Sequence, residues 1–221
     1  GSGRYSSTGD QALVLLSLDK AAGDAWIEGN NYFKIVVPVA STAIANSLAN
    51  PGVTLGDLGE IKTMYAGDLQ GQLWKFDFTE GLSSANISNN KIIKTTNGVK
   101  KPLFIAKNST TSAGVAQPIT VAPLITTAQG SGVMVIFGTG KFVEQIDASS
   151  SGTQSVYSVW DNGGTTAADY ELTGSTPQQP TASEIVSTVT LQNTAFQHRN
   201  NTMGDFISLP KANHRPLRQR G

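Results

Sequence analysis

The chain has 221 residues with 16 Lys and Arg against 16 Asp and Glu, so its formal net charge at pH 7 is zero. This balance gives no electrostatic case for nucleic-acid binding, and the absence of cysteine excludes disulfide scaffolds, thiolate metal sites and cysteine nucleophiles. The charged fraction of 14% is low and 23 residues are glycine, a composition typical of a turn-rich all-β protein.

The N-terminal part of the sequence predicts strands separated by short turns. Residues 1–3, Gly-Ser-Gly, are typical of a cloning remnant, which would place any secretion signal outside this sequence. An apolar run at 12–19 predicts a strand, residues 20–24 predict a turn, and residues 25–28 predict a second short strand. No apolar run approaches the roughly 18 residues that a membrane-spanning helix needs.

The next segment predicts a strand and then a short helix. A β-branched run at 32–39 predicts a strand that ends near Pro38, because proline lacks the N–H group for a ladder hydrogen bond. Residues 41–49 favour one or two helical turns, which Pro51 would end.

The most informative stretch is a predicted hairpin. Two short strands, 64–66 and 72–78, flank a tight turn at 67–71 in which glycine permits a positive φ. Asp68 is placed to accept hydrogen bonds from backbone N–H groups of this turn, and Asp77 is placed to cap the next turn. Alternation of apolar and polar residues along the second strand predicts one buried face. β-Propellers repeat hairpins of this kind within their blades.

The C-terminal half predicts further strands separated by loops. These strands are expected at residues 102–106, 118–126, 133–137, 154–161, 185–191 and 205–209. The run at 133–137 is apolar enough for a fully buried inner strand. Residues 163–184 show little periodicity and predict a long loop or insertion. Residues 138–141, Gly-Thr-Gly-Lys, have the wrong spacing for a phosphate-binding loop and predict a tight turn.

Three motifs occur in the order typical of one family. Residues 65–77 read Tyr-Ala-Gly-Asp-Leu-Gln-Gly-Gln-Leu-Trp-Lys-Phe-Asp, residues 117–123 and 135–142 read Gln-Pro-Ile-Thr-Val-Ala-Pro and Val-Ile-Phe-Gly-Thr-Gly-Lys-Phe, and residues 154–161 read Gln-Ser-Val-Tyr-Ser-Val-Trp-Asp. Together these motifs resemble the PilY/PilC-type proteins, the tip-located adhesins of bacterial type IV pili. The resemblance implies an all-β, quinoprotein-like β-propeller with four-stranded antiparallel blades. The chain offers roughly three blades' worth of strands, whereas a closed propeller has at least four, so we expect a partial propeller.

The resemblance also implies the domain organisation and the structural positions of the motifs. Residues 1–221 are expected to form one propeller part, with 210–221 as a tail cut before the next strand. The positions that build the motif hairpins and turns are Tyr65, Gly67, Asp68, Gly71, Trp74, Phe76, Asp77, Gly138, Gly140, Trp160 and Asp161.

The function that the resemblance implies is non-catalytic and concerns the pilus. Such a protein would support pilus assembly against retraction, adhesion and twitching motility through protein–protein contacts, at the pilus tip or outer membrane on the bacterial cell surface. Its expected partners are minor pilins at the pilus tip and a receptor on a host cell or an abiotic surface. Loops at 82–101, 107–116 and 163–184 are candidate contact surfaces, because binding residues commonly lie on loops that a rigid scaffold holds.

Calcium is a cofactor that the resemblance brings into question. In the family, the loop before the hairpin often carries an acidic calcium-binding run, which corresponds here to residues 54–62. The positions where oxygen ligands are needed carry Thr54, Gly56, Leu58 and Lys62. Asp57 and Glu60 alone cannot supply the six to eight oxygens that calcium takes. We therefore expect no calcium in this loop, and we expect the Lys62 ammonium and local turn hydrogen bonds to hold it instead.

The titratable residues favour structural roles. The carboxylates near predicted strand ends, where a carboxylate caps a turn, are Asp19, Asp68, Asp77, Glu80, Glu144, Asp147 and Asp161. His198 and His214 have no ligand partner at i+2 or i+4 spacing, which disfavours a zinc site. The sequence predicts no catalytic residue, no cofactor-binding residue and no metal ligand.

Two other functions stay open: a quinone-dependent propeller oxidoreductase and a purely structural scaffold domain. The family fold resembles that of quinoprotein dehydrogenases, and Trp26, Trp74 and Trp160 carry rings able to stack on a quinone. Each lies in or beside a strand-like run, so packing against a neighbouring blade is the favoured role.

Overall fold

The computed structural model describes residues 11–42, 44–107, 114–128, 131–143, 145, 147, 154–166 and 169–170, and the backbone of strands between residues 172 and 209. The strands are β1 (Gln11–Leu16), β2 (Tyr32–Val37), β3 (Gly52–Leu55), β4 (Ile61–Gly67), β5 (Gln72–Asp77), β6 (Thr95–Thr96), β7 (Val99–Lys100), β8 (Phe104–Ile105), β9 (Leu124–Thr127), β10 (Val133–Gly138), β11 (Gln154–Asp161), β12 (Leu172–Thr173), β13 (Ile185–Val189), β14 (Phe196–Asn200) and β15 (Gly204–Leu209). They are accompanied by one short helix, α1 (Ser84–Ser88), and the prediction of an all-β chain is confirmed.

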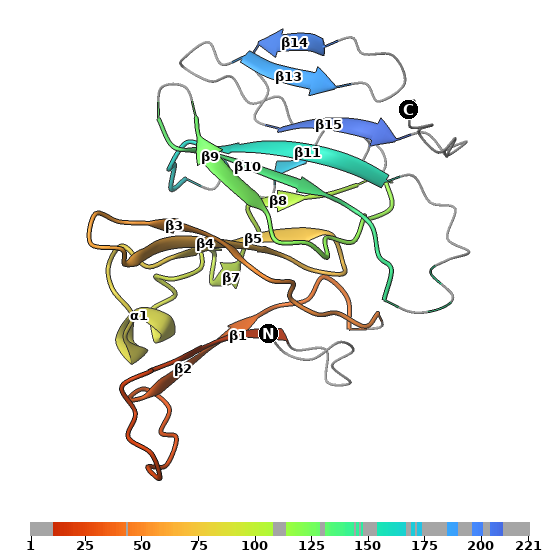
Figure 1. The fold of residues 1–221 in the computed structure, drawn as a ribbon. Coiled ribbons are helices and arrows are strands. Elements are labelled where there is room, and N and C mark those ends of the chain that lie inside the picture. Colours follow the sequence, from red (N-terminus) through yellow and green to blue (C-terminus); the bar gives the residue numbers. More distant parts are fainter. Residues whose placement is uncertain are drawn as a thin grey trace, which may run out of the picture.

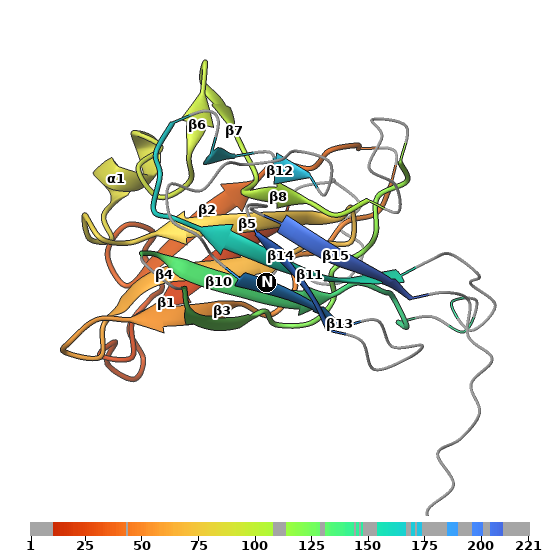
Figure 2. The same cartoon turned by 90° about the horizontal axis from the view of Figure 1, so that it is seen from above.

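Three sheets are stacked as layers (Figure 1). The first layer is the hairpin β1-β2, the middle sheet has the order β12-β8-β5-β4-β3, and the third has the order β15-β11-β10-β9. The four strands of the third sheet pair antiparallel, as expected of a blade, although β12, β13 and β14 lie between β11 and β15 in the sequence. Figure 2 shows the sheet of β10 and β11 lying over the sheet of β4 and β5.

Two hydrophobic cores lie between the three layers. The core between β1-β2 and the middle sheet contains Leu13, Ile35, Val37, Leu48, Met64, Ala66, Trp74, Phe76, Ile92 and Ile93. The core between the middle and third sheets contains Tyr65, Leu73, Leu103, Phe104, Ala106, Ile119, Val135, Phe137, Tyr157, Val159 and Trp160. In this second core the rings of Phe137 and Tyr157 stack with their centroids 5.4 Å apart. Removing large apolar side chains from water stabilises a fold by about 1.5–3 kcal/mol each, so these cores hold the layers together.

The predicted hairpin is confirmed as β4 and β5, but the expectation of one buried face is wrong. Met64 and Ala66 enter the first core, whereas Tyr65 between them enters the second. Leu73 and Trp74 divide in the same way on β5. Because the middle sheet is covered on both sides, successive side chains along a strand enter the two cores in turn, and neither face of the strand points to solvent.

Most other predicted strands are found, with changed ends. Strands β1, β2, β10, β11, β13 and β15 lie within or at the predicted positions. The strand expected at 118–126 is shortened to β9, and the strand expected at 102–106 is shortened to the two residues of β8. Strand β10 is only half buried: Val135 and Phe137 enter the core, whereas the alternating side chains are partly exposed.

Two segments differ from their predicted secondary structure because side chains take the backbone hydrogen bonds. Residues 25–28 form no strand beyond a single bridge at Glu28. The Asn31 side chain accepts from the Ile27 N–H at 2.7 Å and donates to the Ala25 carbonyl at 2.9 Å. The segment therefore folds as a loop closed by one asparagine.

The described residues of 41–49 form no helix. The Gln70 side chain accepts from the Ser41 N–H at 2.8 Å and donates to the carbonyls of Ser41 and Ile44 at 2.7 and 2.8 Å. These contacts hold the segment over the hairpin turn in an irregular path and replace the hydrogen bonds of a helix.

The connections between strands lie on two opposite sides of the stacked sheets. The turn 56–60 joins β3 to β4. The insertion 78–103 follows β5 and starts beside this turn, since the Phe78 N–H donates to the Lys62 carbonyl at 2.8 Å. Loop 17–31, between β1 and β2, reaches the same side, because Gly29 lies against the Ser84 side chain at the start of α1. Turn 68–71 lies at the other end of β4 and β5.

Candidate functional site

The hairpin turn encloses a buried carboxylate. Asp68 is fully buried between β4 and β5. Its Oδ1 accepts from the backbone N–H groups of Gln70 at 3.0 Å and Gln72 at 2.9 Å, as the sequence predicted. Its Oδ2 accepts from three side chains: Gln11 Nε2 at 2.8 Å, Asn46 Nδ2 at 3.2 Å and Trp74 Nε1 at 3.0 Å. One carboxylate thus ties the hairpin to the first layer and to the segment before β3.

Neutral N–H groups donate the hydrogen bonds to the Asp68 carboxylate. Burial raises the pKa of the Asp68 carboxyl above its ordinary value, and the surrounding donors, led by Trp74 and Gln11, counteract this rise. All five contacts are N–H donors, which match the acceptor-only ionised form. The site is therefore a structural anion held by neutral groups.

A second buried group lies between the middle and third sheets. Lys75 Nζ on β5 forms an ion pair with Asp161 Oδ2 on β11 at 2.7 Å, and their side chains are only 7% and 4% exposed. The Tyr65 hydroxyl on β4 donates to the same oxygen at 2.6 Å. Asp161 Oδ1 accepts from the Gly163 N–H at 2.9 Å, so it also caps the turn that follows β11. A lysine and a tyrosine of the middle sheet therefore bind an aspartate of the third sheet.

The phenols beside this ion pair stay neutral. Burial, and then the negative charge of Asp161, raise the pKa of Tyr65 above its ordinary range. Burial and the same carboxylate raise the pKa of Tyr170. Tyr65 therefore acts as a hydrogen-bond donor, and a phenolate that could serve as a base is disfavoured.

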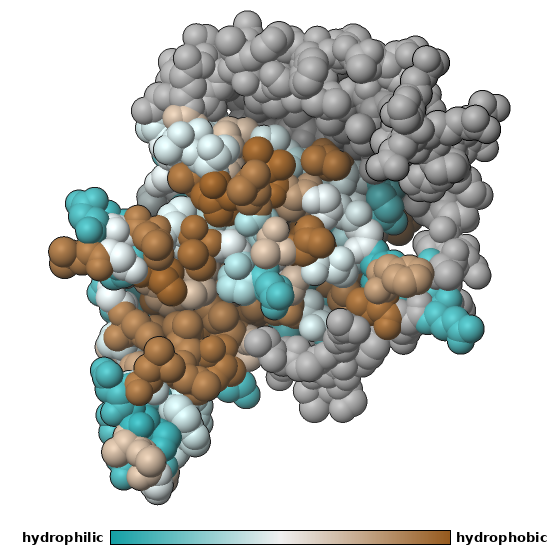
Figure 3. Space-filling model, in the orientation of Figure 1, coloured by the Kyte–Doolittle hydropathy of each residue, from teal (hydrophilic) through white to brown (hydrophobic). Residues whose placement is uncertain are grey.

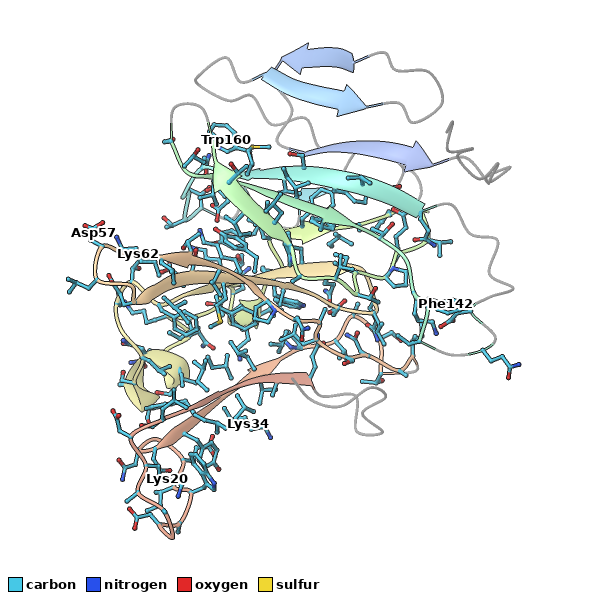
Figure 4. All side chains as sticks on the ribbon, in the orientation of Figure 1. Lys20, Lys34, Asp57, Lys62, Phe142 and Trp160 are labelled. Atoms are coloured by element: carbon cyan, nitrogen blue, oxygen red, sulfur yellow. The ribbon has the colours of Figure 1, made fainter. Side chains whose placement is uncertain are left out.

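The remaining motif residues are also structural. Phe76 and Trp160 are buried in the first and second cores, and Trp160 Nε1 donates to the Ser131 carbonyl at 2.9 Å (Figure 4). Asp77 caps its turn as predicted, accepting from the Thr79 N–H at 3.0 Å.

Glycine is required at two of the motif turns. Gly71 has φ +80°, and a Cβ there would lie 2.9 Å from the carbonyl oxygens of Ala106 and Gln117. Gly67 faces Ile119, where a Cβ would overlap the side chain. Gly138 ends β10, and Gly140 donates its N–H to the Pro118 carbonyl at 2.8 Å. The tight turn predicted at 138–141 is wrong, because residues 139–142 form no turn and the return strand β11 begins only at Gln154.

The loop at 54–62 is a hairpin turn between β3 and β4. The Gly56 N–H donates to the Glu60 carbonyl at 2.8 Å, and the Glu60 carboxylate accepts from the Leu58 N–H at 3.0 Å. The expected contribution of the Lys62 ammonium is wrong within the described part of the chain, since that side chain takes no ion pair there. Local turn hydrogen bonds hold the loop.

We predict that calcium leaves the stability of this turn unchanged. Thr54 Oγ1 is already paired with Thr63 Oγ1 at 2.5 Å, and Glu60 is already used by the turn, so few carboxylate oxygens remain for a cation that takes six to eight ligands. The measurement is thermal unfolding with millimolar calcium against excess chelator, in wild type and in a Glu60→Gln variant. A rise in melting temperature with calcium that Glu60→Gln abolishes would contradict this prediction.

The other titratable candidates are dispersed. Glu80 pairs with Lys91 at 3.2 Å on the surface, Asp147 pairs with Lys141 at 3.1 Å, and Asp19 is exposed. Glu144, His214 and the side chain of His198 lie outside the described residues. Within the described residues, no three His, Cys, Asp or Glu side chains come together as a group that could hold a metal, and no helix has the length and hydrophobicity needed to cross a membrane.

The tryptophans offer little room for a quinone. Trp74 and Trp160 are buried and their indole N–H groups are hydrogen bonded, whereas Trp26 lies on the surface under Lys20, whose Nζ is 4.9 Å from the ring centroid. Packing is the role that the geometry supports for the two buried rings.

The candidate contact loops differ in how they are held. Residues 82–101 contain α1 and the β6-β7 hairpin, and Lys100 Nζ fixes this hairpin to the Val36 carbonyl of β2 at 2.6 Å. Lys94 Nζ donates to the Thr165 carbonyl of the third layer's outgoing loop. Most of 107–116 and of 163–184 lies outside the described residues.

Sequence reasoning missed the long-range partners of both carboxylates. Lys75 appeared as an outward polar residue, and Gln11 carried no signal at all. A lysine between apolar residues in a strand was the one available hint, because such a side chain either reaches solvent or needs a buried acid.

A model of the PilY1 beta-propeller domain matches residues 2–197 of this chain. A protein named type IV pilus biogenesis factor PilY1, from Pseudomonas aeruginosa, is 34% identical over 189 residues, covering 79% of this chain and 15% of the relative. A PilY1 homolog from Xylella fastidiosa is 33% identical over 126 residues, covering 53% of this chain and 8% of the relative. The chain therefore spans a small part of the length of the relatives that it matches.

A solved structure agrees with these sequence matches. The crystal structure of the Pseudomonas aeruginosa PilY1 C-terminal domain aligns with a TM-score of 0.51 and 26% identity. The alignment covers 79% of this chain and 41% of that one. The predicted β-propeller fold and the predicted family resemblance are confirmed.

Proposed function

Since the chain belongs to the PilY1 beta-propeller domain family, we propose that it serves as part of a type IV pilus biogenesis factor. Its relatives carry that role in their names, and the chain matches one portion of them. The observation that carries the proposal is the intact signature hairpin, whose polar side chains build the joints between layers.

The chemistry of these joints supports a role without catalysis. Asp68 is surrounded by five donors, and Asp161 is saturated by Lys75, Tyr65 and a backbone N–H. A general acid, base or nucleophile has to reach a substrate, whereas these groups are buried and already bonded. The family's conspicuous residues thus stabilise a scaffold, which leaves its loops for protein–protein contacts.

At the pilus, the proposed role is to favour assembly over retraction. The partners would be minor pilins at the pilus tip, and the protein would lie at the bacterial cell surface, where it also supports adhesion and twitching motility. A receptor on a host cell or an abiotic surface would be a second contact.

Deletion of the gene in a strain with an active retraction motor tests this role. We expect few or no surface pili by electron microscopy and loss of twitching on agar, because pili that are not protected at the tip would be withdrawn. Re-expression of the full-length protein is the control and should restore both. Unchanged piliation and twitching in the deletion strain would reject the proposal.

A further inference from the structure

On one side of the stacked layers, a loop and a turn that are fixed by hydrogen bonds expose apolar side chains. We define the loop face as loop 17–31 together with turn 56–60, which lie on the same side of the layers (Figures 1 and 2). Leu58 is 95% exposed at the tip of the turn. Leu18, Trp26 and Ile27 are 97%, 50% and 54% exposed on the loop. Figure 3 shows hydrophobic side chains at the β3-β4 turn and over the β1-β2 layer, whereas the far end of loop 17–31 is mostly hydrophilic to neutral in this view.

These tips are held in place by their own hydrogen bonds. Asn31 closes loop 17–31 through Ile27 and Ala25, and Lys20 Nζ donates to the carbonyls of Ala21 and Asp24, both at 2.9 Å. Lys20 also lies over the Trp26 ring. An ordered tip loses little conformational entropy when it binds, so an exposed tryptophan on such a loop is a suitable anchor for a protein partner.

The charges around the tips define the partner further. Loop 17–31 carries three carboxylates, Asp19, Asp24 and Glu28, against the single ammonium of Lys20. Turn 56–60 carries Asp57 and Glu60 and no basic residue. Lys62 lies beside Asp57 (Figure 4), so each apolar tip has more carboxylates than ammonium groups around it. This excess of negative charge complements basic side chains and opposes an anionic lipid surface.

We propose that the loop face is a docking surface for a pilus protein that offers apolar pockets rimmed by Lys or Arg. Leu18, Trp26, Ile27 and Leu58 would fill the pockets, and the carboxylates would meet the basic rim. This inference rests on the proposed function, since it assigns the surface through which the minor pilins would be bound.

The test compares matched exposed residues on the two sides of the layers. The loop-face variants are Trp26→Ser with Ile27→Ser, and Leu58→Asp. The control is Phe142→Ser, because Phe142 is also 78% exposed but lies on the opposite side from Asp57 and Lys62 (Figure 4). All four side chains are on the surface, so the variants should fold as the wild type does.

The probe is the purified complex of soluble minor-pilin domains from the same bacterium, titrated against the full-length protein. We expect each loop-face variant to weaken binding by at least about tenfold, mainly through faster dissociation, and Phe142→Ser to bind like the wild type. We also expect wild-type association to slow as salt is raised, because the attraction is partly electrostatic.

Several results would overturn the inference. These are wild-type affinity in both loop-face variants, an equal loss in Phe142→Ser, or no binding of the wild-type protein to this complex. Binding to vesicles of anionic phospholipid, with a blue shift of the Trp26 emission, would assign the loop face to a membrane and overturn it as well. Loss of wild-type binding to the complex would also remove the minor pilins as proposed partners, whereas the other results leave them in place. The role in assembly is tested separately by the gene deletion, so it can stand when this inference fails.

Discussion

Replacing Asp161 by Asn is expected to lower the free energy of unfolding by about 3–5 kcal/mol, because Lys75 would be left as an unpaired charge between two sheets. An asparagine can offer one oxygen, whereas the aspartate accepts from Lys75, Tyr65 and the Gly163 N–H on both of its oxygens. Either orientation of the amide turns its NH₂ group toward a donor. Thermal unfolding of the full-length protein should show a melting transition lower by roughly 10 °C.

Two further variants check the cause of this loss. Lys75→Met should cost a similar amount, and the double variant should cost clearly less than the sum, because each single change breaks the same pair. Lys91→Met is the control: it breaks the exposed pair with Glu80 and should cost no more than about 1 kcal/mol. Additive effects of the two buried changes would show that the ion pair does not couple the sheets.

The second large effect is expected for Asp68→Asn, which should destabilise the protein by about 3 kcal/mol or more. The asparagine oxygen can keep the two backbone N–H groups of the turn, but its NH₂ group would then face the donors of Gln11, Asn46 and Trp74. Leaving a buried donor unpaired costs about 1–3 kcal/mol each. Chemical denaturation of the full-length protein measures the change.

A matched substitution in the same motif controls for the asparagine itself. Asp77 accepts from the Thr79 N–H in an exposed turn, and an asparagine oxygen can take over that contact. We therefore expect Asp77→Asn to change the stability by less than about 1 kcal/mol. Equal losses at Asp68 and Asp77 would mean that the buried network contributes nothing beyond an ordinary turn cap.

The sequence predicted local features of the site well because they depend on neighbouring residues. The hairpin, its glycine turn and the backbone contacts of Asp68 follow from the order of residues between 64 and 78. The partners of that carboxylate do not, since Gln11 lies 57 residues earlier and Asn46 lies 22 residues earlier. Lys75 and Asp161 are likewise far apart in sequence, so their pairing emerges only when the layers stack.

The wrong local predictions have a common physical origin. Residues 25–28 and 41–49 have backbone groups that a strand or helix would satisfy, but the side chains of Asn31 and Gln70 satisfy them first. Propensity describes a segment that supplies its own hydrogen bonds, and it fails when a side-chain amide outside the segment supplies them. The same amides shape the surface, since Asn31 closes the loop that carries Trp26.

Buried polar contacts and exposed apolar side chains have different roles in this molecule. Polar groups that the motif brings to the interior join β1-β2, the middle sheet and the third sheet, whereas the loop face carries some of the exposed apolar side chains. A rigid scaffold with ordered loops suits a protein that acts by binding.

The most direct test of the proposed role at the pilus is a count of surface pili in a strain that lacks both this gene and the retraction motor. If the protein acts by favouring assembly over retraction, pili that disappear in the single deletion should return to near wild-type numbers in the double deletion, because nothing withdraws them. Pili that stay absent without the motor would contradict an action against retraction.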